Sequence, residues 1–365
     1  MKRREFLKGA AVTASAAGVS TLAAPAIAQG TVEMAIVSTW PRDFPGLGTS
    51  AQRAAARIGE LSEGRINVTY YAAGEKVGAF DSLDEVAAGN SQAYIGADYY
   101  WKGKHPAWAY FTAVPFGLTY AEIDAWMKFG GGKELHQEVA GQFGIHPLQV
   151  GNTGVQMGGW FNKEINSADD LKGLKMRIPG LGGDVLAKLG ASPVSLPGGQ
   201  IYENLVSGAV DATEWVGPWN DYFMKFYEAA KYYYYPGMHE PGSQLTMGIN
   251  ASWWGNLSKT DQELITAACM EENAMQMAET NARNGEYLTK LINEHGVVLK
   301  EFNDEVYDAF YEAAEEVFDE TRQHSELAAK VHDNFAAFRS DVGRWMLAAE
   351  ATYLRQRNRV SGVTL

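Results

Sequence analysis

The chain of 365 residues contains one cysteine, so no disulfide bond can form within it. That residue, Cys269, stands in the apolar run Leu264–Met270, where a buried thiol is the ordinary case and a catalytic one is rare. The histidines are scattered along the chain and show none of the spacings of a zinc site. No nucleophile stands in a recognisable pattern with a base. These absences argue against zinc-dependent and covalent catalysis.

Positive charge is scarce as well. The chain carries 31 lysines and arginines against 44 aspartates and glutamates, which gives a formal net charge of −13. Residues 1–28 hold four basic side chains and one acidic side chain, so the chain without them has a net charge of −16. This acidity argues against nucleic acid or an anionic membrane surface as a partner. An anionic ligand would need local positive charge to overcome the overall field.

Apolar runs of membrane-spanning length are absent after the N-terminal segment. There, Lys2–Lys8 with its Arg3-Arg4 pair precedes a run of Ala, Gly and Ser that ends in Ala26-Ile-Ala28. This layout predicts a twin-arginine export signal over residues 1–28, cleaved near Ala28–Gln29, and a mature chain in the periplasm. A membrane anchor is the alternative, but Gly, Ser and Thr dilute the run and Pro25 interrupts it.

The first part of the mature chain alternates between strand and helix patterns. Apolar and β-branched residues predict strands, and amphipathic spacing predicts helices, in the order Val32–Thr39, Thr49–Leu61, Ile66–Tyr71, Asp81–Ala88 and Ala93–Asp98. This order predicts a doubly wound α/β lobe. With 46% apolar residues in 365, the chain is long enough for a large core and two lobes.

Ligands of such sheets bind beyond the carboxyl ends of the strands. Tyr99 and Tyr100 follow the third predicted strand at such an end. They are candidates to stack on or hydrogen-bond a ligand, and packing between the lobes is an equally good interpretation.

Further along, strands are expected at Val155–Phe161, Lys175–Ile178 and Leu245–Ile249, and Ser258 is expected to cap a helix. The C-terminal third reads as helical. Its apolar residues alternate spacings of four and three, which is typical of helix packing between subunits or back onto the domain. These residues are Val331, Phe335, Phe338, Val342, Trp345 and Ala349.

Four stretches together supply the groups of a candidate binding site. Arg177 offers a planar fork for a carboxylate, and three side chains, Gln156, Glu214 and Glu240, offer oxygen ligands for a hard cation. Each residue alone also has an ordinary interpretation, as a surface ion pair, a turn hydrogen bond or a solvated acid. The stretches are Gly151–Trp160, Leu174–Ile178, Asp211–Pro218 and Tyr232–Glu240.

On these motifs the whole mature chain resembles the solute-binding proteins of the tripartite ATP-independent periplasmic (TRAP) transporters, and most closely their 2-oxo-acid, pyruvate-type binders. The resemblance implies an α/β, two-lobed periplasmic binding protein that closes like a flytrap, with hinge strands and a long C-terminal helical segment. We expect lobe 1 to comprise residues 29–150 and about 217–247, and lobe 2 about 151–216 and 248–300. Residues 301–365 would form the C-terminal helices of a homodimer, which is swapped in the closest relatives.

The resemblance also assigns roles to individual residues. It implies that Arg177 and Asn152 bind the substrate, with Tyr99 and Tyr100 beside it, and that the cation site doubles as part of the substrate site. Sodium is favoured as the cation and calcium is possible. The implied metal ligands are Gln156, Glu214, Trp215 and Glu240.

A cation held by two glutamates, an amide oxygen and a carbonyl can chelate the adjacent oxygens of a 2-oxo acid. Together with Arg177 it would neutralise the two acids and the ligand. The expected protein is therefore a receptor, not an enzyme, which passes a small 2-oxo monocarboxylate to TRAP permease subunits. The alternatives are a lactate receptor using Ca²⁺, a secreted metal-dependent oxo-acid enzyme, and a receptor that feeds a sensor kinase.

Overall fold

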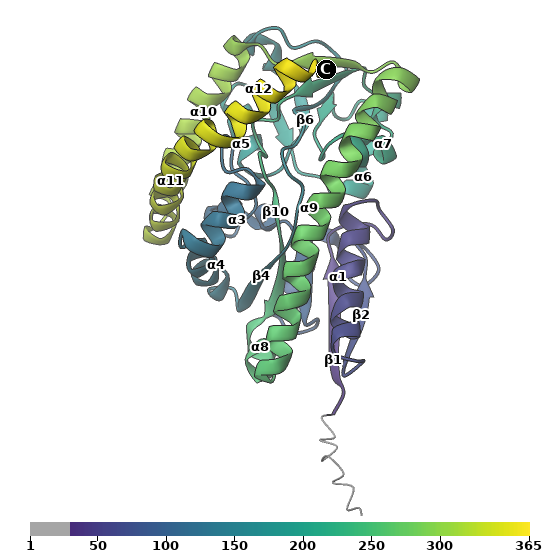
Figure 1. Ribbon diagram of the computed structural model, residues 1–365, viewed down its shortest axis with the longest axis vertical. Coiled ribbons are helices and arrows are strands. Elements are labelled where there is room, and N and C mark those ends of the chain that lie inside the picture. Colours follow the sequence, from purple (N-terminus) through teal and green to yellow (C-terminus); the bar gives the residue numbers. More distant parts are fainter. Residues whose placement is uncertain (1–29) are drawn as a thin grey trace, which may run out of the picture. The chain divides into compact units, whose positions relative to one another are not determined.

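The computed structural model describes residues 30–365, which form two β-sheets with helices packed on them (Figure 1). The export signal expected at residues 1–28, with its cleavage site at Ala28–Gln29, lies outside the described residues. Among residues 30–365, none of the helices combines the length and the apolar content that a membrane span requires.

The first sheet has the strand order β2-β1-β3-β10-β4. Its first three strands in the chain run parallel, and β10 runs antiparallel to both of its neighbours, β3 and β4. The strands are β1 (Val32–Ser38), β2 (Ile66–Tyr71), β3 (Ala93–Gly96), β4 (Ile145–Asn152) and β10 (Gln244–Asn250). The α/β pattern expected for the start of the chain is confirmed.

Helices connect and cover these strands. The intervening helix α1 (Leu47–Leu61) buries its alanine-rich face, and α2 (Ser82–Ala87) links β2 to β3. The helices α3 (Tyr120–Phe129) and α4 (Gly132–Gly141) precede β4. The sequence pattern does not predict β4, because Pro147 and Gly151 are poor strand formers. 

The glycine at position 151 has a packing reason. A Cβ atom there would lie 1.8 Å from the side-chain oxygen of Gln276 on the long helix α9 (Lys259–His295). This helix begins at the expected cap, Ser258, whose side chain accepts the Asp261 N–H. The close approach places α9 directly over β4.

The second sheet has the order β11-β9-β5-β8-β6-β7. β6 pairs parallel with β7 and β8, β9 pairs parallel with β11, and β5 pairs antiparallel with β8 and β9. Its strands are β5 (Gly159–Phe161), β6 (Lys175–Arg177), β7 (Ser192–Val194), β8 (Ala212–Thr213), β9 (Tyr232–Tyr235) and β11 (Val298–Glu301). The helices between them are α5 (Gly180–Lys188), α6 (Gly198–Val206) and α7 (Pro218–Met224).

The strand expected at Val155–Phe161 is shorter than predicted, because only Gly159–Phe161 pairs in the sheet. The preceding segment bonds to two separate loops instead. Gln156 donates its N–H to the Glu240 carbonyl at 3.0 Å, and Met157 donates to the Val216 carbonyl at 3.1 Å. The segment before β5 therefore ties together three parts of the chain.

The division of the chain into lobes stays a prediction, and the two sheets do not divide the chain at residues 217 and 248. β9 lies in the second sheet, although residues 217–247 were expected to join the first lobe, and β10 continues to Asn250 in the first. The helix α9 contacts β4 and α1 of the first sheet and also α7, which precedes β9. Such pairing depends on partners far apart in the sequence, so local patterns do not reveal it.

The C-terminal helices are α10 (Asp304–Gln323), α11 (Glu326–Met346) and α12 (Thr352–Ser361). The expected apolar stripe divides into two parts. Its start packs inward, with Phe335 against Tyr110 and Trp126 at ring-centroid distances of 5.2 and 5.1 Å. Its end does not, since Trp345 is 67% exposed.

Candidate functional site

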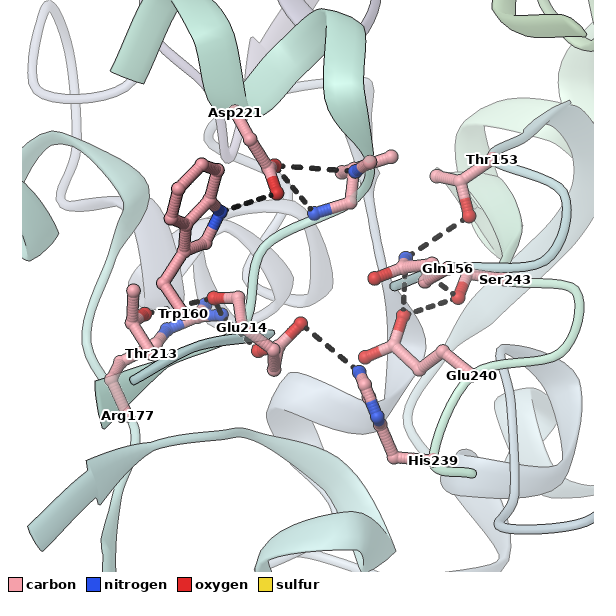
Figure 2. A network of polar contacts seen from close by, with 12 residues as sticks. Thr153, Gln156, Trp160, Arg177, Thr213, Glu214, Asp221, His239, Glu240 and Ser243 are labelled. Atoms are coloured by element: carbon pink, nitrogen blue, oxygen red, sulfur yellow. Dashed lines mark hydrogen bonds and ion pairs between the residues drawn. The ribbon is translucent and has the colours of Figure 1, made fainter. Parts of the chain in front are cut away.

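A buried ion pair lies where the carboxyl ends of β6 and β8 meet. The parallel register of these strands pairs Arg177 with Thr213, so the next residue, Glu214, faces the guanidinium group (Figure 2). Arg177 Nη1 contacts the Glu214 carboxylate and also donates to the Glu214 carbonyl at 3.2 Å. The Arg177 Nε group donates to the Leu196 carbonyl at 3.1 Å, whereas Nη2 has no partner.

Both members of the pair are out of contact with solvent, with side-chain exposures of 1% and 0%. Burial by itself would lower the pKa of Arg177, but the Glu214 carboxylate, together with Tyr100, Tyr99 and Glu240, raises the pKa above its usual value. Arg177 is therefore a fixed cation with one unused hydrogen-bond donor.

A second polar cluster surrounds Gln156, whose amide nitrogen is held by three oxygen atoms. Gln156 Nε2 lies 2.7 Å from Glu240 Oε2, 3.0 Å from Thr153 Oγ1 and 3.1 Å from Ser243 Oγ (Figure 2). With the nitrogen so held, the amide oxygen Oε1 has no partner. Burial and then the charge of Glu214 raise the pKa of Glu240 to about 7.

The histidine that precedes Glu240 joins the two clusters. His239 Nε2 lies 3.3 Å from Glu214 Oε2, and Glu214, His239 and Glu240 each offer an atom within 4.8 Å of the others. Burial would lower the pKa of His239, but the Glu214 carboxylate raises it above the usual value. The family pattern gives His239 no role. Its signal in the sequence is its place next to Glu240, as the one histidine near the expected site.

Trp215 covers the guanidinium group of Arg177, with the indole ring 5.1 Å from its central carbon. The ring meets Phe44 edge-on at a centroid distance of 6.0 Å. On another side it touches α6, because a Cβ atom on Gly198 would lie 2.4 Å from the indole. The indole is thus fixed by three contacts.

Of the remaining expected residues, Asn152 and Tyr99 are buried and Tyr100 is partly buried. Asn152 ends β4 with its Oδ1 atom accepting the Gly154 N–H at 2.8 Å, and its Nδ2 group has no partner. Burial, followed by the charge of Glu240, raises the pKa of Tyr99 well above its usual value. Tyr99 meets Tyr100 edge-on at 4.9 Å. Both tyrosines are near the acids, and their aromatic packing also fits the purely structural interpretation.

Asp221 on α7 holds the loop that follows Trp215. Its carboxylate accepts hydrogen bonds from the indole of Trp160, the hydroxyl of Tyr233 and two backbone N–H groups. Burial raises the pKa of Asp221 to about 7, although these donors oppose the shift. The sequence analysis did not identify this residue, because its partners come from two other strands.

Buried polar atoms without a hydrogen-bond partner are concentrated at this site. Among residues 30–365, twelve buried side-chain nitrogen or oxygen atoms have no hydrogen-bond partner, and six belong to this site. Two of the six, Glu214 Oε2 and His239 Nε2, face each other at 3.3 Å as an ion pair, so four have no polar partner of either kind. Because such atoms are costly to bury unpaired, their clustering indicates a bound group. They are Asn152 Nδ2, Gln156 Oε1, Arg177 Nη2, Glu214 Oε2, Trp215 Nε1 and His239 Nε2.

The six atoms divide by chemistry. Gln156 and Glu214 present oxygens that suit a hard cation, whereas Asn152, Arg177 and Trp215 present donors that suit an anion. The sixth atom, His239 Nε2, faces the Glu214 oxygen at 3.3 Å. The residues present thus fit a cation bound next to a small anion. With two sheets flanking these groups, the fold and the site define a protein of the solute-binding class.

Comparison with known proteins identifies the family. Residues 29–324 match the model of the DctP family, described as bacterial extracellular solute-binding protein, family 7. A relative from Nostoc sp. is 40% identical over 358 residues, covering 97% of this chain and 98% of its own, and is named a monocarboxylate 2-oxoacid-binding periplasmic protein. The chain belongs to the DctP family of TRAP solute-binding proteins.

Solved structures agree with this placement. A TRAP periplasmic solute-binding protein from Pseudoalteromonas atlantica, with bound sodium and pyruvate, is 38% identical and superposes with a TM-score of 0.86, covering 89% of this chain and 99% of its own. One from Bordetella bronchiseptica is 33% identical with a TM-score of 0.89, covering 91% and 99%. It is a mixed-occupancy dimer with copurified calcium and picolinate in one site.

Proposed function

We propose that this chain is an extracytoplasmic receptor that captures a 2-oxo monocarboxylate together with a metal cation and delivers it to TRAP permease subunits. The observation that carries the proposal is the cluster of unpaired buried atoms, with oxygens and donors side by side. The named ligand of the Nostoc relative and the sodium and pyruvate of the Pseudoalteromonas structure support the same class of ligand.

Arg177 and Asn152 bind the ligand carboxylate in this proposal. The free Nη2 group of Arg177 and the free Nδ2 group of Asn152 are the donors available for it. The indole of Trp215 covers one face of the guanidinium group, so the ligand meets the edge of Arg177. Tyr99 and Tyr100 lie beside this space and exclude water from it.

Gln156, Glu214, the Trp215 carbonyl and Glu240 hold the cation. When bound, the cation supplies positive charge that the carboxylate and 2-oxo oxygens of the ligand can share. Oxygen ligands of this kind suit both sodium and calcium, and we favour sodium from the pyruvate-bound neighbour. The role of this chain's residues is to bind and orient, and we propose that the protein does so without turnover.

The two sheets with their helices act as the two lobes. Contacts between them include a hydrogen bond of 2.8 Å from Asn220 Nδ2 to the Pro45 carbonyl and one of 2.8 Å from the Phe116 N–H to the Met238 carbonyl. Lys102, which follows β3, also forms an ion pair with Asp184 on α5. These contacts close the lobes over the ligand, and their loss opens them.

We further propose that the C-terminal helices join two copies of the chain. Large apolar side chains remain exposed at the end of α11 and along α12, which is unusual for a monomer surface. The dimeric Bordetella structure supports this assignment. Light scattering of the chain with and without residues 344–365 tests it, since the truncated chain should be monomeric. The exposed residues are Trp345, Leu347, Tyr353, Leu354, Val360, Val363 and Leu365.

Calorimetric titration of the mature protein, freed of copurified ligand, tests the main proposal. Pyruvate, 2-oxobutyrate and lactate are titrated in sodium buffer, in calcium buffer and with chelator. Stoichiometric, cation-dependent binding of an oxo acid without its consumption is the expected result. Preference for lactate with calcium would replace the ligand assignment. Consumption of the ligand would establish an enzyme instead.

A further inference from the structure

Three successive carbonyl groups of the loop Glu214–Val216 differ in their hydrogen bonding. The Glu214 oxygen accepts from Arg177 at 3.2 Å and from the Thr213 hydroxyl at 2.9 Å. The Val216 oxygen accepts the Met157 N–H at 3.1 Å. Between them, the Trp215 oxygen receives no hydrogen bond from any of residues 30–365. One carbonyl is left available in a loop whose other carbonyls are paired.

Asp221 holds the peptide groups of this loop from one side. Its Oδ1 atom accepts the N–H groups of Val216 and Gly217, each at 3.2 Å. The other oxygen, Oδ2, accepts the Trp160 indole N–H at 2.9 Å and the Tyr233 hydroxyl at 2.7 Å. Trp160 lies on β5 and Tyr233 on β9, so the second sheet fixes the carboxylate, and the carboxylate fixes the loop.

The direction of the Trp215 carbonyl follows from peptide geometry. In a planar trans peptide group the C=O and the N–H point in opposite directions. The Trp215 C=O and the Val216 N–H belong to the same group, and the N–H points at Asp221. The carbonyl therefore points away from Asp221. Figure 2 shows Asp221 on one side of the loop, with Gln156 and Glu240 on the other.

We propose that Asp221 is a positioning residue that aims the Trp215 carbonyl at the cation. This inference rests on the proposed function, in which Gln156, Glu214 and Glu240 supply the other oxygens. Asp221 itself touches neither cation nor ligand. Partners that orient metal ligands in this way change metal affinity by about 10–100-fold when they are removed.

Calcium ion alone, without any organic ligand, is the probe for the variant test. Asp221→Leu removes the acceptor, and Asp221→Asn keeps one acceptor oxygen of the same size. The dissociation constant should rise at least about tenfold in the leucine variant and less in the asparagine variant, which is partial rescue by the conservative change. Titrations are made at a temperature where circular dichroism shows every variant to be folded.

Tyr233→Phe is the matched control. It removes a hydrogen bond to Oδ2 of Asp221 but leaves Oδ1 and both backbone N–H groups in place. It should lower the melting temperature, and the calcium affinity should fall less than in either Asp221 variant, because Trp160 still donates to Oδ2 and Oδ1 keeps both backbone N–H groups. Equal loss of affinity in Tyr233→Phe and Asp221→Asn would overturn the proposal, since destabilisation alone would then explain both.

A second measurement needs no variant. Trp215–Val216 is the only place in the sequence where valine follows tryptophan. Carbon-13 in the tryptophan carbonyl and nitrogen-15 in valine therefore give a single carbonyl–amide correlation, which reports the Trp215 carbonyl and the Val216 N–H together. Addition of calcium should shift the carbonyl resonance of the wild-type protein.

Failure of this inference can be told apart from failure of the proposed function. If calorimetry shows that calcium binds and the Trp215 carbonyl resonance does not move, this inference is wrong and the proposed function stands. If neither calcium nor sodium binds, with or without an oxo acid, the proposed function fails together with it.

Discussion

Arg177 and Glu214 form an ion pair inside the protein, where each is the nearest charge available to the other. The ion pair does not use every donor of the guanidinium group, since Arg177 Nη2 has no hydrogen-bond partner. Isolated charges are costly to bury, so each residue depends on the other in the absence of ligand. Arg177 thus serves the fold and the ligand at once, and substitutions must be chosen to separate the two roles.

Arg177→Lys is the substitution that separates them. The positive charge beside Glu214 remains, but the planar fork that would hold the ligand carboxylate is lost. A charge-assisted hydrogen bond contributes about 1.5–3 kcal/mol, so we expect the dissociation constant for pyruvate to rise about 10–150-fold. Calorimetry measures it. Arg177→Met should also lower the melting temperature, because the buried Glu214 would lose its Arg177 partner and keep only His239 at 3.3 Å. Unchanged pyruvate affinity in Arg177→Lys would rule out the clamp.

Gly198→Ala should disturb the site through Trp215. The new Cβ atom would lie 2.4 Å from the indole, which must move away from Arg177. We expect ligand affinity to fall by about 5–150-fold, since overpacking costs about 1–3 kcal/mol. The adjacent Gly199→Ala is the matched control, because nothing lies within 4 Å of a Cβ atom there. Equal affinities for the two variants would show that the position of the indole does not matter.

The sequence motifs name Gln156, Arg177, Glu214 and Glu240 because these residues stand in short stretches with recognisable patterns, and the structure brings their side chains together. Asp221 has no such pattern, since its partner Trp160 is 61 residues away and meets it only in the folded sheet. The same limit applies to the division into lobes. The tyrosine-rich strand β9 is not among the predicted strands, and its partners β5 and β11 cannot be inferred locally. Short motifs therefore predict local structure better than they predict pairing between distant parts of the chain.

Stability should depend on pH through His146, which lies far from the site. Its ring stacks on Trp254 at 4.3 Å, and burial lowers its pKa to about 4. The unfolded chain takes up this proton near its usual pKa of about 6.5. Its contribution to stability is thus complete above about pH 6.5 and is lost as the pH falls towards 4.

His146→Phe keeps the aromatic stack and removes the titration. Urea unfolding at pH 7 and pH 4.5 should show a smaller loss of stability for this variant than for the wild-type protein. Carboxylates that titrate in the same range contribute equally to both proteins and cancel in the comparison. An identical loss in the two proteins would assign the acid sensitivity to those carboxylates alone.

Closure of the lobes should depend weakly on the ion pair between Lys102 and Asp184. It joins the segment after β3 to helix α5, and the side chains are 31% and 42% exposed. Exposed pairs contribute about 0.2–1 kcal/mol, so Lys102→Ala should speed ligand dissociation by no more than about fivefold. The effect should disappear at high salt, which screens the pair.

Lys104→Ala is the control, because Lys104 pairs with Asp84 at 2.8 Å within the first lobe. Stopped-flow dissociation measures both variants. A faster rate in both, or in neither, would show that this ion pair does not act on closure.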